Sequence, residues 1–188
     1  MDFISTDIEG VCLIKPDMFC DQRGFFMETF NQGKYADGGV PYSFVQDNMS
    51  SSGRGTLRGL HYQLKKPQGK LVFVLKGDIF DVAVDIRRGS PTFGRWVGYT
   101  LSDSSRYQLF VPPGFAHGFM VLSETAEVYY KCTDLYCYED EYGLLWSDPK
   151  IGIEWPGQEV ILSEKDISLP TLAAINEQYL PVWSGQCE

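Results

Sequence analysis

The stretch KLVFVLKGDIFDVAVDI, residues 70–86, carries the strongest fold signal in the chain. Residues 70–75 are mostly apolar and of strand length, and Lys76-Gly77-Asp78 ends that run with turn-forming residues. From residue 79 onward one face is apolar and the other carries two aspartates, namely Phe80, Val82, Val84 and Ile86 opposite Asp81 and Asp85. The stretch therefore predicts two β-strands separated by a turn.

Further runs of strand character follow this stretch. They cover residues 95–101, 107–111, 118–122 and 127–133, with turn signals at Ser102-Asp103 and Pro112-Pro113-Gly114. Helical signal is weak: residues 31–37 predict a turn or two, and residues 170–177 a short terminal helix. Many short strands at this spacing predict an all-β antiparallel sandwich or small barrel, whose interior is wide enough for one small ligand.

Composition limits the partners of the chain. Its 188 residues include 25 acidic and 16 basic side chains, for a net charge of −9, with 44% hydrophobic and 22% charged residues. These values fit a soluble globular chain of single-domain length. The negative charge argues against nucleic acid and anionic membranes as partners, because surfaces that bind them must be basic. An anionic small molecule needs only a few cations that converge locally.

The N-terminus and the cysteines predict a cytoplasmic protein. Residues 1–7 lack the basic and apolar regions of a signal peptide, and the longest apolar run, residues 71–75, is too short to span a bilayer. The cysteines are odd in number and include no CxxC pair: Cys12, Cys20, Cys132, Cys137 and Cys187. We expect them to be reduced thiols.

The first candidate site lies in LRGLHYQ, residues 57–63, and contains one of only two histidines. Strand alternation points Arg58 and His61 to opposite sides, so they converge only if Gly59 marks a bulge. In one interpretation Arg58 and Lys70 hold an anion while His61 moves a proton. In the other, His61 is an ordinary half-buried histidine among surface charges, and the local sequence alone favours this second interpretation.

The second candidate site contains the other histidine, His117, in the spacing P-x-G-x-x-H. This spacing resembles the second motif of cupin barrels, in which the histidine binds a metal. The companion cupin motif is H-x-H, whereas this chain has His61-Tyr62-Gln63. A metal would need Gln63 or a carboxylate as a substitute ligand, although first-row metals favour imidazole. We therefore expect no metal and assign His117 a hydrogen-bonding role.

Two further clusters have both a functional and a structural interpretation. Tyr129 and Tyr130 face opposite ways on a strand, so one of them points inward, either to donate a proton or simply to pack. Ser163 and Asp166 have the spacing of a helix cap. Alternatively, the Asp166 carboxylate reaches an imidazole and fixes its tautomer. The spacing alone favours the cap.

Taken together and in order, these segments resemble the dTDP-4-dehydrorhamnose 3,5-epimerase family. The resemblance covers most of the chain, from about residue 10 to residue 166. The matching blocks are DQRGFF (21–26), FVQDN (44–48), LRGLHYQ (57–63), PQGKLV (67–72), DVAVDIR (81–87), PGFAHGF (113–119), YKCT (130–133), IGIEWP (151–156) and LSEKD (162–166). Any one block is weak evidence, whereas the ordered set is specific.

The resemblance implies one cupin-like domain over residues 1–188, an antiparallel jelly-roll barrel with a few short helices. It also implies a homodimer that needs neither metal nor cofactor. The reaction inverts both carbons beside the C4 ketone of a nucleotide sugar, which converts dTDP-4-dehydro-6-deoxy-D-glucose to dTDP-4-dehydro-β-L-rhamnose. This step belongs to dTDP-L-rhamnose biosynthesis.

The resemblance also implies roles for individual residues. His61 matches the base that removes the proton beside the ketone, and Asp166 matches its partner. Tyr130 matches the acid that returns a proton on the opposite face, and Lys70 matches the cation beside the enolate oxygen. Substrate-contacting positions fall on Arg23, Phe26, Glu28, Gln46, Asn48, Arg58, His117, Glu141 and Lys165, with Tyr136 stacked on the thymine. Because the family dimer shares an N-terminal strand, we expect Arg23, Phe26 and Glu28 to serve a neighbour's site.

Three other functions remain open at the level of sequence. The first is an epimerase of a dTDP-4-keto-deoxysugar that inverts only C3 or only C5. The second is a non-catalytic sugar-nucleotide-binding cupin, and the third is a metal-dependent cupin enzyme. The presence of both His61 and Tyr130 argues against the non-catalytic module.

Overall fold

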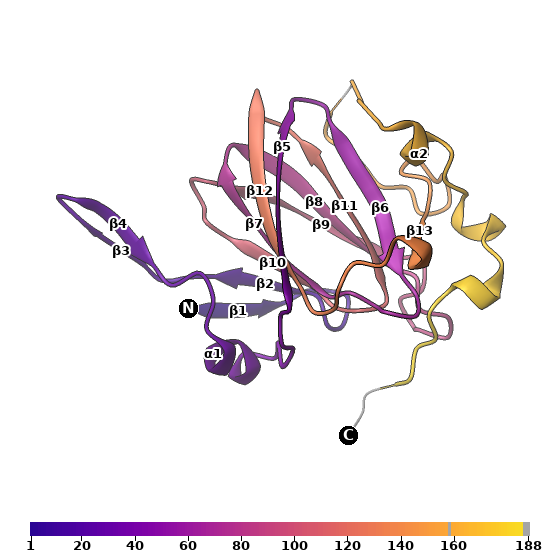
Figure 1. Ribbon diagram of the computed structural model, residues 1–188, viewed down its shortest axis with the longest axis horizontal. Coiled ribbons are helices and arrows are strands. Elements are labelled where there is room, and N and C mark those ends of the chain that lie inside the picture. The colour runs from indigo at the N-terminus through magenta and orange to yellow at the C-terminus, as the bar shows by residue number, and fades with distance from the viewer. Residues whose placement is uncertain (158, 186–188) are drawn as a thin grey trace.

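Two β-sheets face each other in the computed structural model, which describes residues 1–157 and 159–185 (Figure 1). The first sheet contains, in spatial order, β1 (Asp2–Ser5), β2 (Cys12–Lys15), β10 (Gln108–Val111), β7 (Lys70–Lys76), β12 (Thr125–Cys132) and β5 (Gln46–Gly53). The second contains β13 (Glu141–Gly143), β6 (Leu57–Gln63), β11 (Phe115–Val121), β8 (Asp78–Asp85) and β9 (Trp96–Ser102). Neighbouring strands in both sheets run antiparallel, which confirms the predicted all-β architecture.

The main hydrophobic core fills the space between the two sheets. It combines Val72 and Val128 from the first sheet with Ile79, Ala83 and Phe119 from the second. Burial of such side chains is the main favourable contribution to folding, at about 25 cal/mol per Å² of apolar surface. The open end of this core is where the polar residues described below line a cavity.

Both sheets are also covered on their outer faces. Val82 and Val84 of β8, and Ile86 directly after it, pack against Leu144 and Leu180 of the C-terminal part of the chain. The first sheet is covered by the segment around α1 (Gln32–Asp37), and these contacts form a third apolar cluster: Ile14, Tyr35, Val40, Leu71 and Phe110. A strand covered on both sides has to be apolar on both faces, which explains the apolar run in β7. The aspartate-bearing face of β8 points between the sheets.

The predicted strands are confirmed, with small shifts at their ends. The runs at 70–75, 79–86, 95–101, 107–111 and 127–133 correspond to β7, β8, β9, β10 and β12, whereas β11 begins three residues before the predicted run, at Phe115. The predicted helix at 31–37 is α1, and the Asn31 side chain caps it by accepting from the Lys34 backbone N–H. The helix predicted at 170–177 is wrong. That region forms two 3₁₀ turns, η2 (Leu172–Ala174) and η3 (Glu177–Tyr179).

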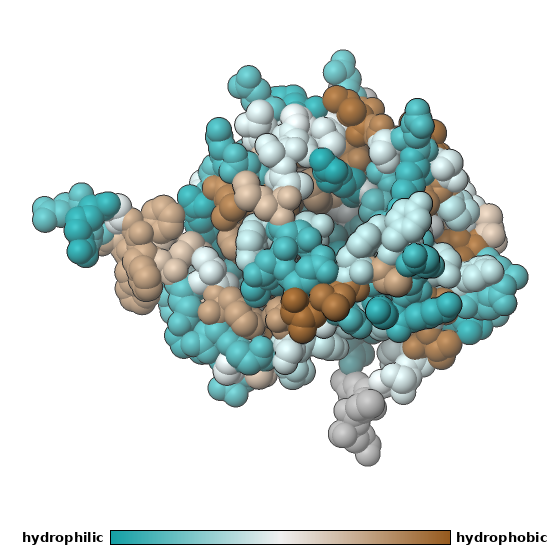
Figure 2. All heavy atoms as spheres, viewed as in Figure 1, coloured by the Kyte–Doolittle hydropathy of each residue, from teal (hydrophilic) through white to brown (hydrophobic). Residues whose placement is uncertain are grey.

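A hairpin of β3 (Met18–Asp21) and β4 (Gly24–Met27) projects from the body of the molecule (Figure 1). Its apolar side chains are exposed, and they form the brown patch on the projecting arm in Figure 2. Phe26 is the most exposed of them, at 70%. Within the described part of this chain the Arg106 guanidinium lies 4.9 Å from the centroid of the Phe25 ring, yet Met18, Phe19, Phe25 and Phe26 all stay exposed.

The structure also shows the state of the cysteines and the character of the helices. Cys12, Cys20, Cys132 and Cys137 are free thiols, as predicted, and Cys187 lies outside the described residues. Within residues 1–157 and 159–185, no helix has the length and apolar character needed to cross a membrane.

Candidate active site

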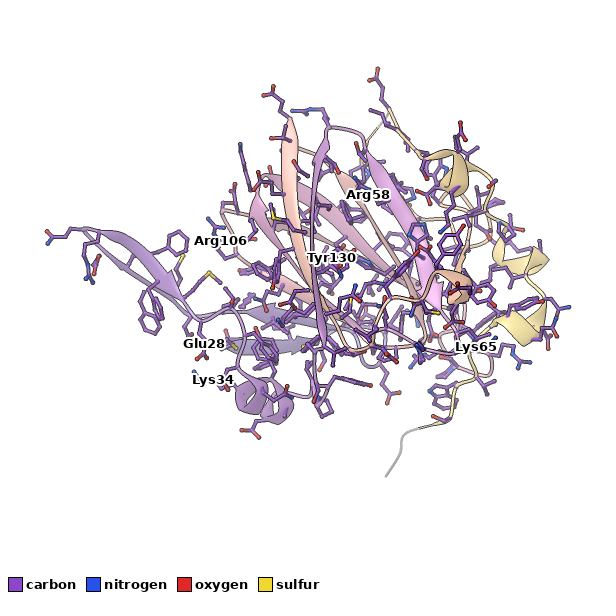
Figure 3. The ribbon with its side chains drawn as sticks, viewed as in Figure 1. Glu28, Lys34, Arg58, Lys65, Arg106 and Tyr130 are labelled. Carbon is purple, nitrogen blue, oxygen red and sulfur yellow. The ribbon has the colours of Figure 1, made fainter. Side chains whose placement is uncertain are left out.

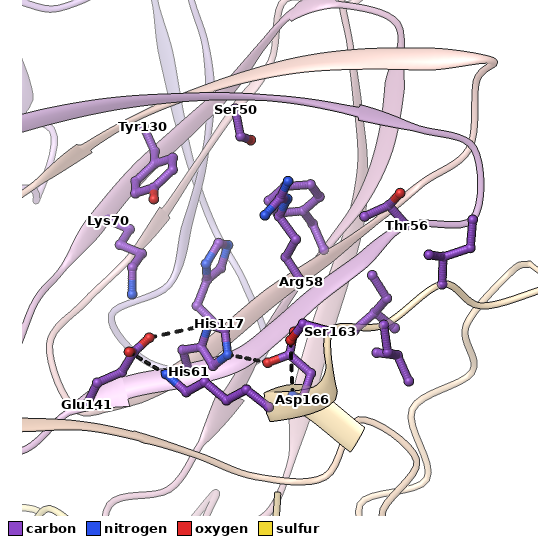
Figure 4. Close-up of a pocket in the computed structure, with 15 residues that line it drawn as sticks. Ser50, Thr56, Arg58, His61, Lys70, His117, Tyr130, Glu141, Ser163 and Asp166 are labelled. Atoms are coloured by element: carbon purple, nitrogen blue, oxygen red, sulfur yellow. Dashed lines mark hydrogen bonds and ion pairs between the residues drawn. The ribbon is translucent and has the colours of Figure 1, made fainter. Parts of the chain in front are cut away.

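A cavity of about 530 Å³ opens between the two sheets (Figure 4). It continues into a second lobe of about 310 Å³, and His61, Lys70, Tyr130 and Glu141 line both lobes. The first lobe also holds Arg58, His117, Ser163, Lys165 and Asp166, and the second holds Gln46, Asn48 and Tyr136. Most residues predicted for the site, although dispersed along the chain, therefore surround one continuous space.

His61 and Asp166 form a close pair at the floor of the first lobe. His61 Nε2 lies 2.6 Å from Asp166 Oδ1, although the residues are 105 positions apart. Asp166 belongs to α2 (Glu164–Ile167), which begins after the cap residue Ser163. The segment before α2 is held against the start of β6, because the Leu57 N–H donates to the Ile161 carbonyl at 2.9 Å. This contact places the Asp166 carboxylate beside the histidine.

The two interpretations of Asp166 concern different atoms, and the structure shows a contact for each of them. Its backbone N–H donates to Ser163 Oγ at 3.1 Å and completes the helix cap. Its side chain reaches the imidazole of His61 instead of the backbone of the cap residue. Asp166 thus takes part in the cap of α2 through its backbone and contacts His61 through its side chain.

The protonation state of this pair follows from its contacts. Burial by itself raises the pKa of Asp166, but hydrogen bonds from His61 and Ser163 outweigh burial and hold that pKa below its ordinary value. The ionised carboxylate only accepts hydrogen bonds, so His61 carries its proton on Nε2 when the imidazole is neutral. His61 Nδ1 then holds a lone pair. That atom lies 3.9 Å from Glu141 Oε1, within the cavity lining.

A bulge in β6 brings Arg58 to the same cavity as His61. In the pairing of β6 with β11, His61 lies opposite His117 and Arg58 lies opposite Phe119, so β6 contains one extra residue. This is the bulge that convergence of Arg58 and His61 requires. Gly59 has a φ of +111°, and a Cβ there would lie 2.6 Å from the His117 carbonyl oxygen. Only glycine fits this position without displacing the neighbouring strand.

Tyr130 and Lys70 reach the cavity from the opposite sheet. Tyr130 lies on β12 and Lys70 on the neighbouring β7, whereas His61 lies on β6 of the second sheet (Figures 3 and 4). Burial raises the pKa of the Tyr130 phenol, which therefore stays protonated at neutral pH. Burial lowers the pKa of the Lys70 ammonium, and the attraction of Cys132 and Glu141 offsets only part of that effect. Tyr129 points to the other side and packs on Phe73 at a ring distance of 5.1 Å.

Glu141 connects the catalytic candidates to the second lobe. One of its oxygens accepts from the Tyr136 hydroxyl at 2.8 Å and from the ammonium of Lys165. Burial tends to raise the pKa of Glu141, but the Lys165 and Tyr136 hydrogen bonds outweigh it and hold that pKa below the ordinary value. The hydrogen bond to Glu141 raises the pKa of Tyr136 to about 12. Glu141 is therefore an anion whose Oε2 atom is engaged by Tyr136 and Lys165.

His117 also pairs with a carboxylate, one that the sequence did not indicate. Its Nε2 lies 2.8 Å from Oδ1 of Asp81, which points inward from β8 and is fully buried. His117 lines the first lobe. Within the described residues, no group of three or more His, Cys, Asp or Glu side chains is arranged to hold a metal ion.

Three predicted substrate-contacting residues lie away from this cavity. Arg23 and Phe26 are on the projecting hairpin, and Glu28 is at its base beside Lys34 (Figure 3). Arg23 is paired with Asp21 of the same hairpin, and its side chain is 85% exposed. The cavity is instead completed by residues that sequence reasoning missed: Ser50, Thr56, Phe119, Ile161 and Leu162. Nothing in their local pattern distinguishes them from ordinary strand and loop residues.

Comparisons with known proteins agree with this geometry. The sequence profile of the dTDP-4-dehydrorhamnose 3,5-epimerase family matches residues 5–174. The enzyme of that name from Neisseria gonorrhoeae is 53% identical over 188 residues, which is 100% of this chain and 57% of the relative. This chain therefore spans little more than half the length of that relative.

Solved structures show the same fold. A dTDP-6-deoxy-D-glucose-3,5-epimerase from Legionella pneumophila, in complex with dTDP-4-keto-L-rhamnose, has a TM-score of 0.95 and 49% identity, covering 98% of this chain and 99% of that chain. A 3'-monoepimerase from Streptomyces bikiniensis, in complex with dTDP-quinovose, has a TM-score of 0.88 and 32% identity, covering 95% of this chain and 92% of that chain. With its profile match over most of its length and these relatives, the chain belongs to the dTDP-4-dehydrorhamnose 3,5-epimerase family.

Proposed function

We propose that this protein converts dTDP-4-dehydro-6-deoxy-D-glucose to dTDP-4-dehydro-β-L-rhamnose by inverting C3 and C5. The observation that carries the proposal is the placement of a base and an acid on opposite sheets. His61, paired with Asp166, lies on one side of the cavity and protonated Tyr130 lies on the other. Inversion needs both groups. A single group on one face of the sugar returns the proton to the face from which it was removed, so the carbon keeps its configuration.

The first step is removal of a carbon-bound proton next to the C4 ketone. His61 Nδ1 holds the free lone pair, and Asp166 stabilises the imidazolium that forms. The electron pair of the broken C–H bond moves onto the C4 oxygen as an enolate. Lys70, whose ammonium is the cation of this part of the cavity, stabilises that negative charge, and such stabilisation is usually the largest catalytic contribution.

The second step returns a proton to the same carbon from the opposite face. Tyr130 donates its phenolic proton, the enolate collapses to the ketone, and the carbon is inverted. His61 then releases its proton and Tyr130 regains one, so that the cycle repeats at the other carbon beside the ketone. Proton transfer from a positioned group contributes about 10²–10⁴-fold to the rate.

Cations near the cavity suit an anionic nucleotide. Arg58 and Lys165 both line the first lobe in a protein of net charge −9. We assign the diphosphate to these two side chains, since charge-assisted hydrogen bonds to phosphate are among the strongest. Tyr136 offers an exposed ring in the second lobe, and we assign the thymine to it.

A homodimer completes the site in our proposal. The exposed hairpin carries Phe26 and Arg23 away from their own cavity, and its apolar side chains need a cover. We propose that a second copy provides the cover and receives these residues in its cavity. Mixing inactive His61→Asn protein with inactive Arg23→Ala/Phe26→Ala protein under exchange conditions should restore activity, because a mixed dimer holds one intact site. Lack of recovery in confirmed mixed dimers would refute shared sites.

We also propose a cytoplasmic location. The free cysteines within the described residues fit a reducing compartment, in which disulfides rarely persist.

A second candidate function is inversion at one carbon only. The likeness to the Streptomyces bikiniensis 3'-monoepimerase favours it, because the same fold supports both outcomes. The purified 4-keto nucleotide sugar, incubated with this protein and followed by NMR, separates the candidates. Ring coupling constants of the β-L-rhamno product support the 3,5-epimerase, and a product inverted at C3 alone selects the monoepimerase. Unchanged substrate would contradict both.

A further inference from the structure

Gln63 is the last residue of β6, two positions after His61, and it is buried with 4% exposure. Its side-chain amide makes three hydrogen bonds, all to the backbone of two loops. The Nε2 group donates to the Lys66 carbonyl at 2.7 Å and to the Leu135 carbonyl at 3.2 Å. The Oε1 atom accepts from the Cys137 N–H at 2.8 Å. The amide therefore ties the loop after β6 to the loop after β12.

Tyr136 lies between the two residues that Gln63 holds in the second loop. The Tyr136 N–H donates to Gln46 Oε1 at 2.8 Å, and the Tyr136 hydroxyl donates to Glu141 Oε2 at 2.8 Å. Half of the Tyr136 side chain stays exposed and borders the second lobe. The backbone on both sides of this ring is thus fixed while one of its faces is left open.

The first loop is a firm support for this arrangement. The buried carboxylate of Asp140 accepts from the Lys65 N–H at 2.8 Å and from the Lys66 N–H at 2.7 Å. Gln63 then connects this fixed loop to the segment that carries Tyr136. Its position requires both a donor and an acceptor in one side chain. An ionised carboxylate lacks the donor, and a thioether lacks the donor and accepts only weakly, so neither replaces the amide.

We propose that Gln63 is a positioning residue that holds the Tyr136 ring in place as a wall for the base of a nucleoside diphosphate. The inference rests on the proposed function, and it separates affinity from chemistry. Gln63 borders the second lobe, but none of its three hydrogen bonds reaches His61 or Tyr130. It therefore determines how well the nucleotide binds and leaves the proton transfers unchanged.

The first test is Gln63→Met, which keeps the length of the side chain and removes all three hydrogen bonds. Base-on-aromatic stacking contributes enough that misplacing the ring should raise KM, and the Kd for dTDP, about tenfold. The kcat should stay within about threefold of that of the unmodified protein, because the lost binding stabilises the ground state and the transition state equally. Calorimetric titration with dTDP and steady-state kinetics measure the two effects.

The sharper test is a double-mutant cycle with Tyr136→Leu. If Gln63 acts through Tyr136, adding Gln63→Met to Tyr136→Leu changes the Kd for dTDP no further. Additive effects in the double mutant would overturn the inference. Gln63→Glu keeps the acceptor and removes the donors, and it replaces Gln63→Met in the cycle if the methionine variant does not fold.

Asp148→Asn is the matched control. Asp148 is another buried clamp, and its carboxylate accepts from the Lys150 N–H at 2.8 Å and the Leu172 N–H at 2.7 Å, outside both lobes. The Asp148→Asn variant should have a lower Tm and an unchanged KM, whereas the Gln63→Met variant should have a raised KM. If the unmodified protein neither binds dTDP nor converts the nucleotide sugar, the proposed function is refuted. If the unmodified protein does both and the Gln63→Met variant has an unaltered KM and Kd, only the proposed role of Gln63 is refuted.

Discussion

The two histidines of this chain face each other across neighbouring strands, and each is bonded through Nε2 to a carboxylate. Yet the two pairs differ in origin and in access. The partner of His61 comes from α2, near the end of the chain, and the His61 side chain is 28% exposed. The partner of His117 comes from the adjacent strand β8, and that histidine is 8% exposed.

We propose that access to the second nitrogen, and not the presence of a carboxylate, separates the roles of the two histidines. His61 keeps Nδ1 for the cavity while Asp166 holds Nε2. The His117–Asp81 pair is built into the sheet, and Asp81 Oδ2 is buried without a hydrogen-bond partner among the described residues. We expect His61 to transfer protons and His117 to hold the substrate.

Replacing each histidine by asparagine tests this contrast most severely. His61→Asn should lower kcat about 10²–10⁴-fold, because the base is lost. His117→Asn should change kcat less than about tenfold and act mainly on KM, because binding is reduced. Steady-state kinetics on the two variants provide the comparison. Equal losses of kcat would show that the two pairs share one role.

Tyr130→Phe extends the comparison to the opposite sheet. Formation of inverted product should fall about 10²–10⁴-fold, since the acid is lost. Exchange of the substrate C–H with D₂O should continue, because His61 still removes a proton and returns one to the same face. Tyr129→Phe, altered on the outward side of the same strand, is the control and should behave as the original protein. Loss of both exchange and inversion in Tyr130→Phe would contradict the assignment of proton removal to His61 and proton return to Tyr130.

Lys70 should set the alkaline limit of activity. Lys70→Met should lower kcat about 10²–10³-fold, as removal of an oxyanion donor does in other enzymes. Because the pKa of Lys70 is lowered, its ammonium loses the proton below the ordinary lysine value of about 10.4, and kcat should decline there. Lys70→Arg should move that decline to higher pH. A pH–rate profile unchanged by the arginine would assign the limit to another group.

Asp166 should show the smallest effect, in stability. Its folded-state pKa is lowered, so its stabilisation is complete above the unfolded-state value and is lost as pH falls through the folded-state value. The loss amounts to about 1.4 kcal/mol for each unit of lowering. Urea denaturation of the original protein and Asp166→Asn, from about pH 7 to about pH 3, measures it. Parallel pH dependences would show that the pair adds no net stability.

The strand pattern was predictable where one residue in two faces a core. Residues 79–85, in β8, alternate in this way, whereas residues 71–75, in β7, are apolar on both faces because both faces are covered. The hairpin strands β3 and β4 were not predicted, because their apolar side chains are exposed and follow no buried face. Residues 170–177 failed as a helix because Leu172 and Ile175 are held against the second sheet, and Asn176 begins a new cap.

The site was predictable only in part. The sequence named a bulge at Gly59 only as the condition for Arg58 and His61 to converge, and Tyr130 was one of two choices on its strand. The contact of His61 with Asp166 depends on how a distant segment folds back, so spacing favoured the cap over the pair and the family resemblance reversed that preference. Asp81 was visible as one of two aspartates on the polar face of a strand, but its bond to His117 was not.

The central claim is that protons leave and return at both carbons beside the ketone through His61 and Tyr130. The most direct measurement is the reaction of the original protein with its 4-keto nucleotide sugar in D₂O, read by NMR. We predict deuterium at C3 and at C5, each in inverted product, and none within the same time in His61→Asn protein. Inverted product without deuterium at either carbon, or full exchange by His61→Asn protein, would contradict the account.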